Sequence, residues 1–420
     1  MLWILTACST GHTPLNLCIV HSILVNMFLF ALCLALSLGP VALCTLIVSR
    51  QTVFKHPGIF ISSSHIDFTK SKLGAKADPW TSAYKAMDSV AWAKTTWKAS
   101  PVATVRCEDP GTPEYSLEKG CKEERNDALA AYSMALRWSY TKDVQFAKKA
   151  IEILDAWSGT LKGHVGTSSP EQVGLQSGWA GSTWARAAEI IKHTGAGWTS
   201  ASVTRFEGML RDVYLPQVRN GSAANPNNID SAMLEASQSI AVFLDDNTLY
   251  KSVMVRAKQH IRSYIYLSTD GALPVTPSWS NYQTESRVKL LWQNDASFFE
   301  GRTQETCRDL EHASYGLASI SHIMDTAYIQ GDDMYSGEFG TRLQRALEVH
   351  APYAKGGSVP STICKGTLKY TLLPVAEPGY SALVGRLGKS MPKTKAIVEG
   401  SRPAKSNSLF TAWETLSHAG

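Results

Sequence analysis

"RNDALAAYSMALRWSYTKDVQFAKKAIEILDAWS", residues 125–158, repeats apolar residues at spacings of three and four on both sides of a short polar turn. At 3.6 residues per turn, this spacing gives each half one apolar face, so the stretch predicts two helices joined as a hairpin. Similar patterns, separated by short turns of Gly, Asn, Pro and Asp, cover residues 174–194, 203–220, 228–246 and 247–268. The sequence therefore predicts an all-α domain of helical hairpins, followed from about residue 356 by a looped C-terminal cap.

The composition is that of a globular protein with a large core. Of 420 residues, 44% are hydrophobic and 18% are charged, which excludes a disordered chain. The net charge of +5 suits an anionic partner, but no dense run of Lys and Arg indicates nucleic acid. We expect a monomer that needs neither a cofactor nor a metal, because the cysteine spacings fit no usual zinc pattern.

The first 49 residues contain no Lys, Arg, Asp or Glu, and residues 23–48 are almost continuously apolar. Two interpretations compete: a cleaved signal peptide, and an uncleaved anchor formed by residues 23–48 that is long enough to span a bilayer. The short apolar region 27–38 and the following Pro40 favour cleavage. We expect residues 1–49 to be leader or anchor, residues 50–420 to be the folded domain, and the protein to be secreted.

Four cysteines remain outside the leader, and an even number in an exported chain indicates disulfides. Cys107 and Cys121 flank a loop that contains Pro and Gly, so we predict that they pair, with Cys307 bonded to Cys364 as the complement. The "NGS" at Asn220 is a glycosylation sequon in a polar stretch, as expected of an exported glycoprotein.

"CRDLEHASYG", residues 307–316, concentrates charged and proton-transferring groups within a predicted helix. On a helical projection, Arg308, His312 and Tyr315 share one side, and an apolar stripe that includes Leu310 and Leu317 lies on the other. A solvated polar face is the simple interpretation. However, such faces favour Lys and Glu, whereas this one offers an acid, a base and a fixed cation, which is typical of a catalytic surface.

Two further segments carry polar groups in unusual places. In "NPNNID" (225–230), Asn227 and Asn228 precede a helix, where they could cap it or donate hydrogen bonds to a ligand carboxylate. Residues 164–190 contain amides and an arginine beside tryptophans. The tryptophans suit either a core or a sugar-binding surface. The candidates in this second segment are His164, Gln176, Trp179 and Arg186.

Taken in order, "SSPEQVGLQSGWAGSTWARAAEIIKHT", "NNIDSAMLEASQSIAVFLDD", "RTQETCRDLEHASYGLASI", "AYIQGDDMY" and "WETLSHA" resemble the alginate lyase domain family. The resemblance covers roughly residues 55–418. It implies an incomplete (α/α) toroid and cleavage of polyuronates by β-elimination, generally without a metal.

The resemblance also implies roles for individual residues. Removal of the C5 proton of a uronate requires neutralisation of its carboxylate, a base for that proton, and an acid for the O4 leaving group. Arg308 and Tyr315 keep the seven-residue spacing of the family. We therefore expect Asn228 and Arg308 to neutralise the carboxylate, Tyr315, its phenolate favoured by Arg308, to act as base and acid, and His312 to be the next candidate for proton transfer. The expected substrate-binding residues are Asn227, Gln176, Trp179, Arg186 and His164.

One position departs from the family pattern. Lyases of this fold have a catalytic His after the paired asparagines, whereas this chain has Ile229, which cannot accept a proton. Either His312 or His164 substitutes, Tyr315 serves alone, or activity is lost. A single tyrosine can perform both transfers only where the C5 hydrogen and O4 lie on the same side of the ring. Polymannuronate or glucuronan is thus favoured over polyguluronate.

Two other functions compete with the lyase. A glycoside hydrolase on a similar toroid needs two carboxylates that flank the bond, for which Glu305, Asp309 and Glu311 are the candidates. The second alternative is a carbohydrate-binding protein that has kept the cleft and lost catalysis through Ile229. Ultraviolet absorbance of the unsaturated product distinguishes a lyase from both.

Overall fold

The computed structural model describes residues 53–167, 170–295 and 297–420. The predicted leader, residues 1–49, lies outside these ranges. Within them, no helix is both long enough and apolar enough to cross a membrane.

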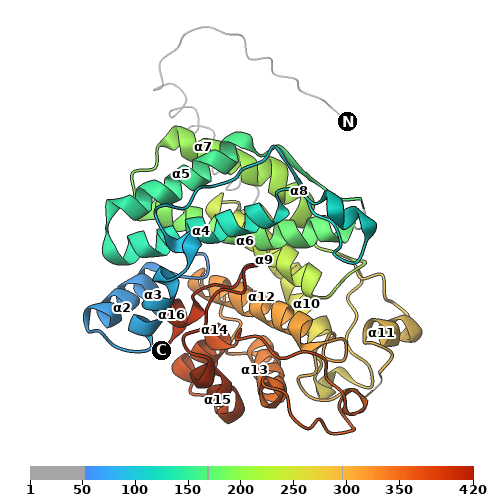
Figure 1. Cartoon of the computed structure of the whole chain (residues 1–420). Helices are drawn as coiled ribbons and strands as arrows, with labels where there is room; N and C mark the ends of the chain where they lie inside the picture. Colours follow the sequence, from blue (N-terminus) through green and yellow to red (C-terminus); the bar gives the residue numbers. More distant parts are fainter. Residues whose placement is uncertain (1–52, 168–169, 296) are drawn as a thin grey trace, which may run out of the picture. The chain divides into compact units, whose positions relative to one another are not determined.

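Four helical hairpins form the body of the domain (Figure 1). Their first helices, α4, α6, α9 and α12, pack side by side as an inner layer, and their partners α5, α7, α10 and α13 pack outside them. This arrangement is an incomplete (α/α) toroid and confirms the predicted all-α class. The bounds are α4 Cys121–Thr141, α5 Val144–Thr160, α6 Pro170–His193, α7 Ser200–Met209, α9 Asn228–Phe243, α10 Asn247–Tyr264, α12 Leu310–Ile329 and α13 Glu338–His350.

Burial separates the two layers. The inner helices are buried around most of their circumference, whereas the outer helices bury one stripe and expose the other. Close packing of the inner layer needs small residues: a Cβ on Gly178 of α6 would lie 2.9 Å from the carbonyl oxygen of Ala232 on α9. Side-chain caps begin the outer helices α5, α7 and α10, as where Asp143 accepts a hydrogen bond of 3.0 Å from the backbone of Gln145.

Shorter elements complete the domain. A π-helical turn, Leu210–Tyr214, joins α7 to α8 (Leu215–Val218), and a two-stranded parallel sheet pairs β1 (Thr104–Arg106) with β2 (Gly163–Val165). The other helices are α2 Ser63–Gly74, α3 Trp80–Asp88, α11 Glu285–Leu291, α14 Glu377–Tyr380, α15 Pro392–Ser401 and α16 Glu414–His418.

The C-terminal segment is more than the looped cap that the sequence predicts. Residues 354–376 are largely irregular, but the chain then forms α14, α15 and α16 and enters the core. Trp413 and Leu416 are fully buried, and the indole of Trp413 donates a hydrogen bond of 2.8 Å to Ser133 on α4. The C-terminus is therefore part of the toroid's packing.

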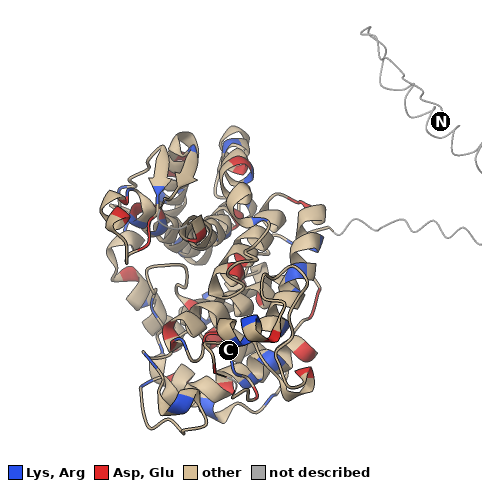
Figure 2. Cartoon of the chain, turned by 90° about the vertical axis from the view of Figure 1, so that its right-hand side faces the viewer, with Lys and Arg blue, Asp and Glu red and all other residues tan. Residues whose placement is uncertain are grey.

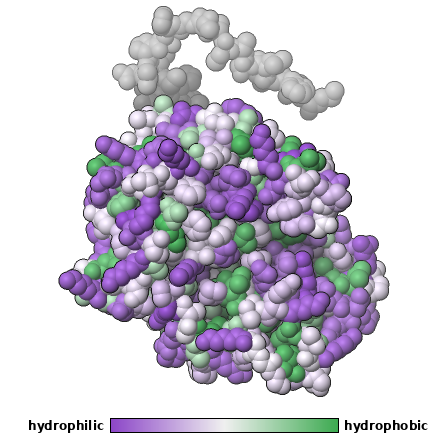
Figure 3. Space-filling model, viewed as in Figure 1, coloured by the Kyte–Doolittle hydropathy of each residue, from purple (hydrophilic) through white to green (hydrophobic). Residues whose placement is uncertain are grey.

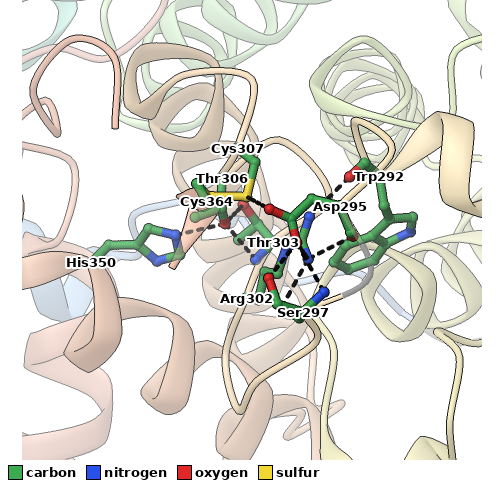
Figure 4. The surroundings of a disulfide bond; sticks show 9 residues. All are labelled: Trp292, Asp295, Ser297, Arg302, Thr303, Thr306, Cys307, His350 and Cys364. Atoms are coloured by element: carbon green, nitrogen blue, oxygen red, sulfur yellow. Dashed lines mark hydrogen bonds and ion pairs between the residues drawn. A yellow bond between two sulfur atoms is a disulfide. The ribbon is translucent and has the colours of Figure 1, made fainter. Parts of the chain in front are cut away.

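Both predicted disulfides are present. Cys107 is bonded to Cys121, and Cys307 to Cys364. Figure 4 shows the second bridge between two polar clusters, with His350 on one side and Arg302 with Asp295 on the other. This bridge ties the segment before α12 to the irregular region at residue 364.

Charged and apolar residues are both spread widely over the described part of the chain (Figure 2, Figure 3). Basic and acidic residues intersperse over the described domain (Figure 2). In Figure 3 the hydrophilic residues dominate, and the apolar ones form scattered patches.

His350 provides a prediction for acid stability. Its Nδ1 lies 2.7 Å from the carbonyl oxygen of Ala346 and its Nε2 lies 2.8 Å from the Thr306 hydroxyl (Figure 4). Burial lowers the pKa of His350 from 6.5 to about 4. Because the unfolded chain binds this proton more readily, the contribution to stability is complete above pH 6.5 and is lost as the pH falls towards 4, by about 3 kcal/mol.

We expect the stability difference between the wild type and His350→Gln to shrink by that amount between pH 7 and pH 4. Urea unfolding at both values measures it. A difference that does not change with pH would mean that His350 titrates normally in the folded protein.

Candidate functional site

The inner helices run parallel, because pairs of residues along them meet in the same order. Trp179 near the middle of α6 faces Tyr315 in the second turn of α12, and further along Arg186 meets His322. Their N-termini therefore gather at one rim of the toroid. Each helix N-terminus carries a partial positive charge and unpaired N–H groups, so this rim favours an anionic ligand.

Glu305 connects two of these helix starts. Its Oε1 accepts a hydrogen bond of 2.7 Å from the Asn228 side chain, and its Oε2 one of 3.0 Å from the Asn228 backbone N–H. Tyr264 donates to Oε2 at 2.9 Å, and Arg308 Nη1 lies 3.0 Å from Oε1. The structure thus brings the predicted pair Asn228 and Arg308 together, through a carboxylate between them.

His312 completes a chain of contacts on the same rim. Its Nδ1 lies 2.8 Å from both carboxylate oxygens of Asp309, and its Nε2 lies 3.0 Å from Nη2 of Arg308. A neutral ring with its proton on Nδ1 satisfies both contacts. Burial favours the neutral acid, but the hydrogen bonds from His312 lower the pKa of Asp309 below its usual value. Since Nδ1 carries the proton in this arrangement, Nε2 of His312 accepts a hydrogen bond from Arg308.

Tyr315 has a different partner from the one the sequence predicts. Its hydroxyl donates a hydrogen bond of 2.6 Å to Oε1 of Glu311, one helical turn earlier. Burial and then this carboxylate raise the pKa of Tyr315 above its usual value. The expectation that Arg308 favours the phenolate is wrong, because Arg308 contacts Glu305, Asp309 and His312 instead.

Apolar side chains surround the Tyr315 ring. Trp179 meets it edge to face at 5.5 Å between centroids and stacks on Phe410 at 5.8 Å. Ile229 packs against the same cluster. Trp179 is 6% exposed, so it packs against Tyr315 inside the protein and does not offer an open sugar-stacking surface.

Two predicted substrate-binding residues lie inside the protein. Arg186 is 1% exposed and pairs with Glu235 and His322, its guanidinium 4.5 Å from the Phe60 ring centroid. The side chain of His164 is 1% exposed, and its Nε2 lies 2.7 Å from Glu124. Burial places both out of direct reach of a polymer, so we correct their assignment to structural positions beneath the rim.

The remaining two candidates lie at the rim itself. Asn227 caps α9, its side-chain oxygen accepting a hydrogen bond of 2.9 Å from the backbone of Ile229, as the capping interpretation predicts. Gln176 is half-buried and accepts a hydrogen bond from Arg125 in the first turns of α4. Arg125 thus adds a second cation to the rim.

A pocket of about 170 Å³ opens beside Glu305 and Arg308. Asn225, Asn227 and Gln304 contribute polar groups to its wall, and Tyr282 an aromatic ring. Gln304 is 1% exposed, and neither its amide oxygen nor its amide nitrogen has a hydrogen-bond partner within the part of the chain that the structure describes. This pocket adjoins the candidate residues Asn227 and Arg308, whereas a hollow of about 380 Å³ near residues 351–397 is lined by none of the candidates.

The sequence model of the alginate lyase family matches residues 69–359. The chain belongs to the alginate lyase family. It is therefore a polysaccharide lyase, and this assignment decides against the hydrolase alternative. No curated protein sequence gives a significant match.

Solved alginate lyases share the fold. The structure of alginate lyase A1-III from Sphingomonas species A1 has a TM-score of 0.60 at 16% identity, covering 88% of this chain and 97% of that one. Its tyrosine-to-phenylalanine variant, complexed with a tetrasaccharide, has a TM-score of 0.55 at 17% identity, covering 88% and 97%. An alginate lyase from Bacteroides ovatus has a TM-score of 0.52 at 12% identity, covering 86% and 99%.

Among the described residues of this family member, His56, Glu189 and His193 are grouped closely enough to suggest a metal site. The two imidazole rings, however, are stacked at 4.1 Å and nearly parallel at 11°. A metal ion bound by both histidines would have to lie in both ring planes, which this stacking forbids. The cluster is explained by contacts of His56 with two carboxylates: its Nδ1 lies 2.7 Å from Glu189, and its Nε2 lies 3.1 Å from Asp245.

Sequence reasoning does not identify three residues that contact the candidates at the rim: Glu305, Glu311 and Arg125. Glu305 and Glu311 were considered only as hydrolase carboxylates, and Arg125 was not considered. The contact of Glu311 with Tyr315 could have been predicted, because the two residues are four positions apart on a helix and side chains at this spacing meet. For Glu305 and Arg125 the partners come from other helices, which periodicity does not identify.

Proposed function

We propose that the protein cleaves an acidic polyuronate by β-elimination, at linkages whose C5 hydrogen and O4 lie on the same side of the ring. Polymannuronate and glucuronan have this arrangement. The observation that carries the proposal is that Ile229 packs against the apolar cluster that contains Tyr315. One proton-carrying hydroxyl is present there, and an apolar side chain occupies the neighbouring position.

In this proposal, Arg308, whose side chain is 39% exposed, receives the uronate carboxylate first. Asn228 is only 2% exposed and donates to the substrate where Glu305 gives way. Both contact Glu305, so the incoming carboxylate has to share these donors with Glu305 or displace it. The rim of helix N-termini and the second cation, Arg125, support an anionic chain. His312 holds Arg308 in place through Nε2 and is the next candidate for proton transfer.

We also propose that the protein is exported. Two disulfides support an oxidising compartment, and Asn220 of the sequon is exposed. Expression of the full chain in a eukaryotic secretory host, with fractionation of medium and membranes, separates a secreted protein from an anchored one. A non-glycosylated protein found only in the cytosol would contradict export.

The activity is tested by incubating the protein with polymannuronate, polyguluronate, glucuronan and hyaluronan and following the ultraviolet absorbance of the unsaturated product. We expect turnover of polymannuronate or glucuronan and at least about tenfold slower turnover of polyguluronate, a difference in barrier of about 1.4 kcal/mol. Binding without absorbance would instead indicate a carbohydrate-binding protein.

Ile229→His sharpens this test, because it places a second proton acceptor beside Tyr315. We expect the variant to gain activity on polyguluronate relative to polymannuronate. An unchanged ratio in a folded variant would mean that position 229 does not face the bond that is cleaved.

A further inference from the structure

Glu311 and Tyr315 form a pair that the proposed function does not yet use. Both lie at the start of α12, one helical turn apart, with 2.6 Å between the phenol and carboxylate oxygens. Tyr315 is 8% exposed and Glu311 is half-buried. The other groups nearby are engaged elsewhere: Arg308 with Glu305, and His312 with Asp309 and Arg308.

A neutral phenol is a poor base, and the groups nearby that could make Tyr315 a better one are limited. Among the described residues no cation contacts its hydroxyl, since Arg308 is held by two carboxylates. The apolar neighbours Ile229, Trp179 and Phe410 provide no acceptor for its proton. The Glu311 carboxylate is hydrogen-bonded to that proton and can accept it.

We propose that Glu311 holds the phenol proton of Tyr315 while Tyr315 removes the C5 proton of the substrate. This inference rests on the proposed β-elimination. In the first step the phenol proton passes to Oε1 of Glu311, the phenol oxygen takes the C5 proton, and the electron pair of the C5–H bond moves into the carboxylate of the uronate. Tyr315 is then a phenol again, now carrying the substrate's proton.

In the second step the C4–O4 bond breaks as the C4–C5 double bond forms. Tyr315 gives its proton to O4, and Glu311 returns the stored proton to Tyr315. Both side chains end as they began, and the C5 proton of the substrate has moved to the leaving group. Because Glu311 acts through Tyr315 and does not touch the substrate, it is a positioning residue that also stores a proton.

A purely structural role for Glu311 is the competing explanation, because a carboxylate in the first turn stabilises a helix. The pH profile separates the two. If Glu311 stores the proton, kcat of the wild type falls on acidification, because a carboxyl group that already carries a proton cannot accept another. Loss of a helix-stabilising charge alone would lower the melting temperature and leave that acid limb in place.

The experiment measures kcat, KM and melting temperature for Glu311→Gln on the substrate that the wild type prefers. Glutamine keeps the hydrogen bond to Tyr315 but cannot take its proton. We expect kcat to fall at least about 100-fold at pH 7 and KM to change little. The acid limb that belongs to Glu311 should disappear, and kcat should rise only at alkaline pH, where the solvent can take the phenol proton. Glu152→Gln, on the exposed side of α5, is the matched control and should behave as the wild type.

A second variant keeps the test decisive if glutamine disturbs folding. In Glu311→Ala, added formate should restore activity in proportion to its concentration, and it should restore none in Tyr315→Phe. Glu311→Gln with kcat within threefold of the wild type and an unchanged acid limb would overturn the inference. If the wild type itself forms no unsaturated product from any of the four polymers, it is the proposed function that fails.

Discussion

Replacing Tyr315 by phenylalanine is expected to lower kcat at least about a thousandfold, while KM and the melting temperature stay close to those of the wild type. The substitution removes one oxygen from a ring that Trp179 and Phe410 hold in place, so the packing of the cluster is kept. The variant loses the hydroxyl that takes the C5 proton and donates a proton to O4. Rates come from the absorbance of the unsaturated product, and folding from thermal melting.

Tyr328→Phe provides a matched control on the same helix. Tyr328 is 40% exposed near the other end of α12, where the Arg386 guanidinium lies 3.8 Å from its ring centroid. Phenylalanine keeps this ring, so we expect wild-type activity. If Tyr315→Phe retains more than about a tenth of wild-type kcat, a deficit of only about 1.4 kcal/mol, then Tyr315 is not the proton carrier. His312 would then become the leading candidate.

The sequence is sufficient to predict the helical hairpins because each outer helix carries one apolar stripe at a period of 3.6. It is also sufficient for contacts within one helix turn, such as His312 with Asp309 and Arg308. The sequence pattern does not predict contacts between helices. Glu305 reaches Asn228 across 77 positions of the sequence, and no periodicity indicates which helix lies opposite.

The assignment of Arg186 to substrate binding fails because the inner helices are buried on all sides. Polar groups beside Trp184 look like a binding surface when α6 is assumed to have a solvated face. In the toroid α6 lies between α4 and α9, and neither side is open. The partners that make a buried arginine tolerable come from three other elements: Glu235 on α9, His322 on α12 and the carbonyl of Phe410.

Arg186→Leu tests this correction, and we expect it to cost about 3–5 kcal/mol of unfolding free energy. The variant leaves Glu235, itself 1% exposed, without its cation in a site that water does not reach. His322 remains as a partner at 3.0 Å and is held on its other side by Glu414 at 2.7 Å. Urea unfolding of both proteins measures the loss, and kcat and KM are measured on the folded variant at low temperature.

The double variant Arg186→Leu/Glu235→Leu distinguishes two causes of the stability loss: an unpaired buried Glu235 and the lost packing contacts of Arg186. Removing both charges leaves no uncompensated ion, so we expect it to recover a large part of the stability that the single variant loses. Arg262→Leu is the surface control: its partner Glu338 is 34% exposed, and the loss should be below about 1 kcal/mol. The opposite result, normal stability of Arg186→Leu with a strongly raised KM, would restore Arg186 to the substrate-binding site. That outcome requires the guanidinium to reach the polymer, which its 1% exposure and its contacts with two helices, the Phe410 carbonyl and the Phe60 ring argue against.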